Sequence, residues 1–303
     1  MTQDLDERQA FGLDLALRAG ALALGMRRTL APIEAKSAID FCTEADRAVE
    51  QLVRAEIGRR FGDAVIGEEY GGEAADRVWV VDPIDGTAGY IHGSGRWCVS
   101  LAYVQDGEIE IGILYAPADD RLFVARRGQG ATLNGRPIRV SGLAHGAAPL
   151  VEVGWSERRP LAAYCTLLQR LTEAGLEFRR HGSGALGLAE VACGLNDGYA
   201  ELHINAWDAL AGILLVREAG GWTNDFLADD GLCPRQPAAR LHPGSQRPAG
   251  GDDPRPGGAD RTTRGSGGLG RPPAQRRHHH KGEERPWHRD GFPPSPASCW
   301  RRS

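Results

Sequence analysis

One short stretch constrains this chain more than any other, because it is an apolar run that ends in two acids. Residues 78–81 are β-favouring and apolar, which predicts a buried strand. Proline donates no hydrogen bond to a sheet and restricts the residue before it, so we expect Asp82-Pro83 to stop that strand. Asp82 and Asp85 then leave the strand end together. Gly86-Thr87 predicts a tight turn that begins a helix, and the free amides of such a turn hold phosphate.

Other acidic clusters lie far apart along the chain but occupy the same kind of position. Each is at the end of a predicted strand or the start of a predicted helix, where functional side chains collect in α/β proteins. Several carboxylates share a pocket without protons only when cations offset their repulsion. Because no His or Cys stands at ligand spacing, the ligands are all oxygen, which favours Mg²⁺ or Mn²⁺ over Zn²⁺. The clusters are Asp46, Glu68-Glu69, Asp82 with Asp85, and Asp208.

Asp208 alone also fits a purely structural role, as an acid that caps the helix following Asn205. Four motifs built on the acids resemble the signatures of the inositol monophosphatase family, in the usual order and spacing. The resemblance covers roughly residues 5–230. The motifs are Asp40-Phe-Cys-Thr-Glu-Ala-Asp46, Gly67-Glu68-Glu69, Asp82-Pro-Ile-Asp-Gly-Thr87 and Trp207-Asp208-Ala-Leu-Ala-Gly212.

The resemblance implies a fold, an activity and a cofactor. The fold is a mixed α/β sandwich with αβαβα layers, as in fructose-1,6-bisphosphatase. The activity is that of a Mg²⁺-dependent, lithium-sensitive phosphomonoesterase, commonly a homodimer. By resemblance, a first metal binds Glu68, Asp82 and the carbonyl of Ile84, a second binds Asp82, Asp85 and Asp208, and a third, weaker ion also contacts Glu68.

The same resemblance implies roles in catalysis and substrate binding. Water activated by Mg²⁺ attacks phosphorus in line, and Thr87, hydrogen-bonded to Asp46, helps to orient and deprotonate it. Glu201 faces substrate hydroxyls, with a surface acid at a strand end as the structural alternative. The substrate contacts implied in this way are Asp85, Gly86, Thr87, Ala185, Glu201 and Asp208.

The residues after Thr87 depart from the pattern and leave the substrate open. Ala88-Gly89-Tyr90-Ile91-His92-Gly93 stands where inositol enzymes tend to have Thr-Asn-Phe-Val-His-Gly, and Cys42 replaces a more usual Val. Our first hypothesis is a small polyol phosphate such as inositol 1-phosphate. Histidinol phosphate is the alternative, followed by a 3′-phosphoadenosine or sugar bisphosphate. A non-catalytic binding protein is the rival from another class, and the intact acid set argues against it.

Hydrophobic periodicity predicts a mixed α/β chain. A long helix is expected from Leu5 to about Leu30, and a second begins after Thr43 as its N-cap. Hairpin turns are expected at Asp106-Gly107 and Asn134-Gly135. Strands and helices then alternate, with strands at 150–155, 176–180 and 197–202 and helices at about 157–174, 184–193 and 206–218.

The composition changes abruptly near Cys233. Residues 233–303 hold 12 of the 18 prolines and no valine or isoleucine, so they cannot bury enough surface to fold alone. We therefore expect a phosphatase-like domain at 1–232 and a disordered tail at 233–303. Arginine outnumbers lysine 34 to 2, which indicates a GC-rich gene. A frameshift near residues 230–235 of such a gene would give this composition in place of the family's last strand and helix.

Charge and cysteines exclude other classes. The tail carries 14 Lys+Arg against 6 Asp+Glu, which leaves −12 for residues 1–232 and argues against a nucleic-acid groove there. The six cysteines show no CxxC pair and predict free thiols. No apolar run is long enough for a membrane span, and the N-terminus lacks the basic start of a signal peptide, so we expect a cytoplasmic protein.

Overall fold

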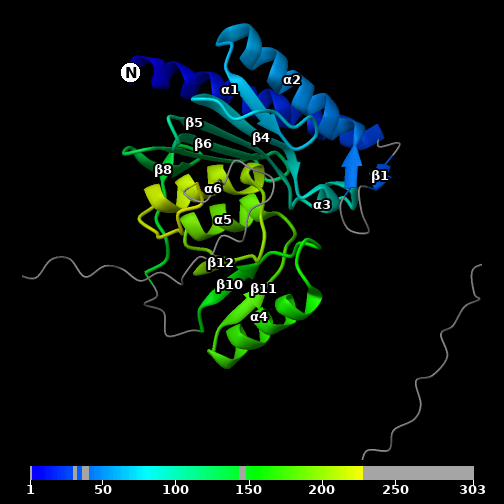
Figure 1. The fold of residues 1–303 in the computed structure, drawn as a ribbon, viewed down its shortest axis with the longest axis vertical. Coiled ribbons are helices and arrows are strands. Elements are labelled where there is room, and N and C mark those ends of the chain that lie inside the picture. The colour runs from blue at the N-terminus through cyan, green and yellow to red at the C-terminus, as the bar shows by residue number, and fades with distance from the viewer. Residues whose placement is uncertain (1, 30–32, 36–40, 143–147, 228–303) are drawn as a thin grey trace, which may run out of the picture. The chain divides into compact units, whose positions relative to one another are not determined.

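The computed structural model describes residues 2–29, 33–35, 41–142 and 148–227. These residues form alternating layers of helices and sheets, in the αβαβα order that the family resemblance implies (Figure 1). From one side to the other, the layers are helices α1 (Thr2–Met26) and α2 (Glu44–Arg60), a large sheet, helices α5 (Gly184–Ala192) and α6 (Ala206–Glu218), a small sheet, and helix α4 (Leu161–Glu173).

The large sheet has seven strands in the order β3-β4-β5-β6-β7-β8-β9. β3 pairs with β4 in parallel, and the other neighbours are antiparallel. Both predicted hairpin turns are present, and Asp106, Gly107, Asn134 and Gly135 all have positive φ, as such turns require. The strands are β3 (Ala64–Gly67), β4 (Arg77–Asp85), β5 (Cys98–Gln105), β6 (Glu108–Ala116), β7 (Arg121–Arg126), β8 (Gly130–Leu133) and β9 (Arg136–Pro137).

β4 continues past the point where Pro83 was expected to end it, and that expectation was wrong. The strand pairs regularly with β5 up to Asp82, and pairing resumes at Asp85 opposite Cys98 after a shift of register. Pro83 lies inside this irregular segment, where the missing N–H costs no ladder hydrogen bond. The irregularity keeps Asp82 and Asp85 on one strand, next to the edge strand β3, while changing the directions of their side chains.

Capping residues set the ends of the helices that lead into the site. Thr43 caps α2 and Asn205 caps α6, each in a capping box, with Asp46 and Asp208 as the respective partners. The predicted range 206–218 for α6 is confirmed. α4 begins later than predicted, at Leu161, because Pro160 occupies the N-cap position.

Several short elements carry no periodic signal in the sequence. α1 ends at Met26 and is followed by a 3₁₀ turn at Arg27–Thr29, earlier than predicted. A one-turn helix, α3 (Thr87–Ile91), follows the turn at Gly86, as expected. A two-stranded antiparallel pair, β1 (Ile33–Ala35) and β2 (Phe41–Thr43), was not predicted, since three residues are too few to show alternation.

The small sheet has parallel strands in the order β11-β10-β12. One apolar core lies between the large sheet and helices α1 and α2, and another lies around α5 and α6. None of the described helices has both the length and the apolar character needed to cross a membrane. The predicted boundary at 232 and the tail lie outside the described residues. The small-sheet strands are β10 (Leu150–Val153), β11 (Glu177–Arg179) and β12 (Gly198–Ala200).

Candidate active site

A cavity of about 750 Å³ opens where the ends of several elements meet. The end of β4, the start of α3, the segment before α5 and the start of α6 all contribute to its wall. These segments are far apart in sequence, and the two sheets place them together. The cavity gathers most of the predicted site residues, namely Glu68, Asp82, Ile84, Asp85, Gly86, Thr87, Glu201 and Asp208.

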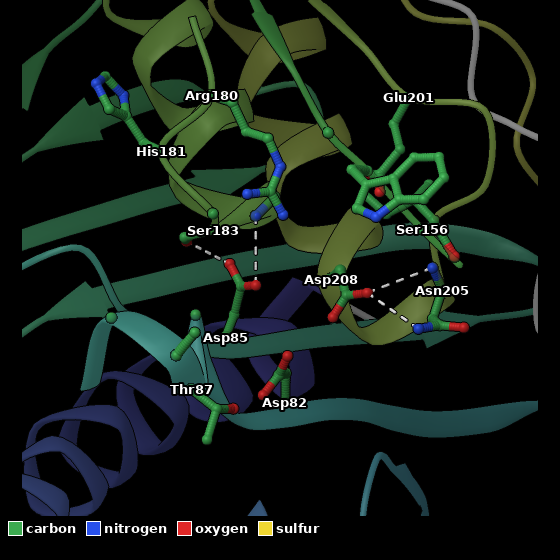
Figure 2. A pocket seen from close by; sticks show the side chains of 18 of the residues that line it. Asp82, Asp85, Thr87, Ser156, Arg180, His181, Ser183, Glu201, Asn205 and Asp208 are labelled. Carbon is green, nitrogen blue, oxygen red and sulfur yellow. Dashed lines mark hydrogen bonds between the residues drawn. The ribbon is translucent and has the colours of Figure 1, made fainter. Parts of the chain in front are cut away.

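Three carboxylates form the centre of the cavity, and we call them the aspartate cluster: Asp82, Asp85 and Asp208. One oxygen from each lies within 4.8 Å of the others. Figure 2 shows the three side chains converging, two from β4 and one from the first turn of α6. Asp82 and Asp85 are buried, and Asp208 is partly buried. Asp82 and Asp85, which belong to one four-residue segment, thus meet Asp208, which lies more than 120 positions later in the chain.

Burial raises the pKa values of the three acids in the aspartate cluster, and repulsion between neighbouring charges adds to the rise at Asp82 and Asp85. Burial, followed by the charge of Glu68, raises the pKa of Asp82 well above its ordinary value. Burial and the charge of Asp208 raise the pKa of Asp85 to about 7. Burial also raises the pKa of Asp208, although Asp82 and Asn205 oppose the rise through hydrogen bonds. Positive charge supplied by a bound cation relieves this kind of destabilisation.

The donor chemistry of the aspartate cluster fits a hard divalent cation. The ligands available are carboxylate oxygens, and hard ions prefer oxygen. Glu68 lines the same cavity, and its charge reaches Asp82. The backbone of Ile84 also lines it, with the N–H donating to Asp82 Oδ1 at 2.9 Å. The arrangement can therefore hold a metal ion.

Asp85 is fixed by the N-terminus of α5, an element of the layer beyond the large sheet. Ser183 Oγ donates to Asp85 Oδ2 at 2.5 Å, and the amide of Ala185 donates to the same oxygen at 2.8 Å. The Gly184 amide donates to Oδ1 at 3.3 Å. Donors at a helix start stabilise the charged carboxylate. The orientation of Asp85 therefore depends on how α5 is placed.

Thr87 joins the start of α3 to the start of α2. Its hydroxyl lies 3.4 Å from Asp46 Oδ1 and 3.1 Å from the carbonyl of Ile84, either of which accepts its proton. Asp46 is fully buried, and its other oxygen accepts from Thr43 Oγ1 at 2.6 Å. Asp46 thus caps α2 and lies within reach of Thr87 Oγ1, which faces the cavity.

Glu201 lies in the wall of the cavity, and its carboxylate is hydrogen-bonded to a buried tyrosine. Tyr199 Oη donates to Glu201 Oε2 at 2.5 Å, and Gly154 makes room, since a Cβ there would lie 2.2 Å from that oxygen. Burial raises the pKa of Glu201 to about 8, and the tyrosine hydrogen bond works against that rise. This carboxyl group is therefore poised to meet a polar group of a ligand.

A second group of acids lies partly in the wall of the same cavity, which Glu152 and His181 line. We call it the glutamate cluster: Glu152 on β10 and Glu190 on α5, with His181 between them. Arg179 donates to Glu190 Oε2 at 2.8 Å, and Arg96 also pairs with Glu190. Arginine charges already offset that of Glu190, so this carboxylate has no need of a metal ion, whereas burial keeps the pKa of Glu152 above its ordinary value.

Sequence reasoning missed several residues of the site. Ser183 carries the signal of an N-cap serine before a helix, which was available in the sequence. Ala185, predicted at the substrate, has a fully buried side chain, and its contribution to the site is its amide on Asp85. Gly184 lines the cavity instead. Asp40, the first residue of its motif, lies outside the described residues. The contact of Tyr199 with Glu201 has no sequence signal.

Comparison with known proteins decides the family. The model of the inositol monophosphatase family matches residues 4–243. The chain belongs to the inositol monophosphatase family. It is therefore a phosphoric monoester hydrolase by family, and the family's dependence on metal agrees with the aspartate cluster.

Relatives with different names share this family. The chain is 38% identical over 230 residues to "Nus factor SuhB" of Pseudomonas aeruginosa, covering 71% of this chain and 85% of the relative. It is 35% identical over 222 residues to "Fructose-1,6-bisphosphatase/inositol-1-monophosphatase" of Thermotoga maritima, covering 73% and 85%. The solved structure of inositol monophosphatase from Anabaena superposes with a TM-score of 0.63 at 32% identity, covering 78% of this chain and 91% of that one.

Proposed function

We propose that this chain is a Mg²⁺-dependent phosphomonoesterase that hydrolyses a small polyol phosphate such as inositol 1-phosphate. One observation carries the proposal: the aspartate cluster, with oxygens within 4.8 Å of one another, lies beside the first amides of α3. The carboxylates attract divalent cations, and the amides at a helix start lack acceptors within the helix and attract phosphate. A phosphate monoester with its metal ions satisfies both groups at once.

Two or three Mg²⁺ ions, or Mn²⁺, are the cofactor of this proposal. Glu68, Asp82 and the Ile84 carbonyl would hold one ion, and Asp82, Asp85 and Asp208 another, with a weaker ion near Glu68. When bound, such ions lower the pKa of water and offset the charge that develops during phosphoryl transfer. They would also return the cluster's carboxyl groups to the charged form that its burial disfavours.

The chain's own residues bind and orient the reactants. The amides of Gly86 and Thr87 would hold the phosphate, and Gly86 adopts a φ of 94°, which glycine tolerates best. Thr87 Oγ1 would accept the proton of the attacking water as it passes its own toward Asp46 Oδ1, 3.4 Å away. Glu201, fixed by Tyr199, would accept hydrogen bonds from substrate hydroxyls. Asp85 and Asp208, which would also hold a metal ion, would contact the leaving group of the substrate.

The choice of substrate is the finer part of the proposal. Glu201 favours inositol 1-phosphate, since its carboxyl group would accept hydrogen bonds from the hydroxyl groups of the inositol ring. Histidinol phosphate is the alternative, because the same carboxylate pairs with an ammonium group. A 3′-phosphoadenosine or sugar bisphosphate ranks third.

Assembly and surroundings are also part of the proposal. We infer a homodimer acting in the cytoplasm, sensitive to Li⁺. The acidic charge of residues 1–232 disfavours nucleic acid as a direct partner. Because the Pseudomonas relative is named a Nus factor, a protein partner is a second candidate role, tested by affinity capture with the purified chain.

A substrate panel tests the proposed function. Purified protein is incubated with inositol 1-phosphate, histidinol phosphate and a 3′-phosphoadenosine bisphosphate, and free phosphate is measured with and without Mg²⁺ and Li⁺. We expect Mg²⁺-dependent release that Li⁺ inhibits, fastest with inositol 1-phosphate. A faster rate with histidinol phosphate would reassign the substrate, and no release from any of them with Mg²⁺ present would contradict the phosphatase.

The division of the chain is a proposal as well. We propose a phosphatase domain at 1–232 and a tail at 233–303 that arises from a frameshift near residues 230–235. Sequencing the gene across that region tests the frameshift. We expect that a change of one base restores a strand and a helix, whereas an uninterrupted frame that no such change improves would contradict it.

A further inference from the structure

Two segments from different sheets must keep their places for the site to work. Residues 86–97 carry the Gly86-Thr87 turn and lead into β5. Residues 180–185 follow β11 and supply the donors that fix Asp85. Neither segment is part of a strand ladder where it borders the cavity, so contacts outside the sheets, from side chains and from backbone amides, hold them in place.

Arg96 contacts the first segment through its backbone. A Cβ at Gly86 would lie 2.6 Å from the Arg96 carbonyl oxygen, and one at Gly89 would lie 2.7 Å from it. The carbonyl is thus packed against both glycines on either side of Thr87. The Arg96 amide donates to Ser94 Oγ at 3.0 Å, which shapes the loop between α3 and β5. The position of Arg96 and that of the phosphate turn are therefore linked.

The side chain of Arg96 contacts the second segment. One guanidinium nitrogen donates to Glu190 Oε1, on α5, and another lies 3.2 Å from His181 Nδ1. Glu190 is only 3% exposed, and Asn196 and Arg179 also donate to it. His181 in turn donates its amide to Glu152 Oε1 at 2.5 Å. One guanidinium thus spans α5 and the loop that leads to Ser183.

We propose that Arg96 is a positioning residue of the phosphate site, which locks the Gly86-Thr87 turn to the segment that holds Asp85. The inference rests on the proposed function in so far as the site binds phosphate. The planar guanidinium makes two contacts in fixed directions, which a lysine cannot reproduce. Charge-assisted bonds to a buried carboxylate are among the stronger hydrogen bonds in proteins. Small displacements of binding groups weaken binding and slow the reaction by large factors. The contacts of Arg96 therefore set the affinity of the site for phosphate.

Arg8 provides a matched control. It is 2% exposed and makes two hydrogen bonds to Asp63, at 3.1 Å from Nε and 3.0 Å from a terminal nitrogen. It stacks on Phe61 and Tyr103, on the α1 and α2 side of the large sheet. Arg8→Met and Arg96→Met each remove an arginine from a carboxylate, but only Arg96 contacts residues that line the site, namely His181 and Gly86.

The test compares wild type, Arg96→Met and Arg8→Met by three measurements. Calorimetry gives the Kd of inorganic phosphate with Mg²⁺ present. Hydrogen exchange without metal follows the peptide that contains residues 180–186. Phosphate release gives KM and kcat. For Arg96→Met we expect phosphate Kd and KM to rise about tenfold and amides 183–185 to exchange faster. For Arg8→Met we expect a lower Tm with these values unchanged.

The outcomes separate this inference from the proposed function. Unchanged phosphate Kd and unchanged exchange in Arg96→Met would overturn the positioning role, whatever the Tm. Should that variant not fold, Arg96→Lys takes its place, with an intermediate rise in Kd expected and a wild-type Kd contradicting the proposal. If wild type releases no phosphate from any ester, the proposed function fails, while phosphate Kd and exchange still decide the role of Arg96.

Discussion

Asp85 in the aspartate cluster and Glu190 in the glutamate cluster are both buried acids, yet the pKa of the first is raised and that of the second is lowered. Around Glu190, burial acts to raise the pKa, but hydrogen bonding and charge from Arg96 and Arg179 bring it below its ordinary value. Around Asp85, the donors are Ser183 and backbone amides, and the pKa stays raised at about 7. Glu190 has arginine partners within the chain, whereas the donors to Asp85 are a hydroxyl and backbone amides, which suits Asp85 to a cation from outside.

This difference supports the proposal that metal binds at the aspartate cluster. The glutamate cluster joins β10, β11 and α5, and its Glu152 and His181 form part of the cavity wall. The aspartate cluster lines another part of the same cavity. Unneutralised buried acids destabilise the folded chain, and bound cations would remove that destabilisation. Metal binding and stability would therefore be coupled.

Replacing Asp82 tests the aspartate cluster with the largest expected effect. We expect Asp82→Asn to lower kcat at least about 10³-fold, because it removes a metal-binding charge from the centre of the site. The neutral amide still accepts from the Ile84 amide, so the fold is kept. Without metal, the variant should melt a few degrees above wild type near pH 8, since one repelling charge is gone. Steady-state kinetics and thermal melts check both parts, and wild-type turnover would contradict the assignment.

Replacing Glu190 tests the glutamate cluster. We expect Glu190→Ala to destabilise the protein by about 1–3 kcal/mol, because it removes a buried carboxylate that partly exposed arginines share. Denaturant unfolding measures this loss. Added Mg²⁺ should not restore it selectively, in contrast to its effect on the aspartate cluster. A loss under about 1 kcal/mol would show that the arginines of this wall do not depend on Glu190.

The pH dependence of metal-free stability compares the clusters directly. An acid whose folded pKa is raised contributes stability that is present below its unfolded pKa and lost as pH rises through the folded value. For Asp85 this window extends from about 4 to about 7. We expect the Tm of metal-free protein to fall across it by several degrees more than that of Mg²⁺-saturated protein. Thermal melts of Asp85→Asn should show a smaller difference, and parallel curves in wild type would contradict the linkage.

Much of the site was predictable because its chemistry is local in sequence. Asp82, Asp85, Gly86 and Thr87 lie in one motif, and the strand and turn signals around them place them at an element's end. Asp208 shows the limit of local reasoning, since a capping acid and a metal ligand look alike in sequence, and the structure gives it both a capping contact and a place in the aspartate cluster.

The remaining features depend on tertiary contacts that leave no periodic trace. Pro83 predicted a strand end, but pairing on either side of an irregular segment carried β4 to Asp85. Arg96 contacts Glu190, 94 positions away in the sequence, and Tyr199 contacts the carboxylate of Glu201. Neither spacing nor composition marks such contacts. Capping residues were the exception, because Thr43 and Asn205 could be read directly from the chain.

The most direct test of the contrast between the clusters is a crystal structure of the protein soaked with Mn²⁺, with anomalous scattering recorded. Our account predicts anomalous peaks among Asp82, Asp85 and Asp208, and none among Glu152, His181 and Glu190. A peak at the glutamate cluster, or an empty aspartate cluster at a Mn²⁺ concentration that supports phosphate release, would contradict it.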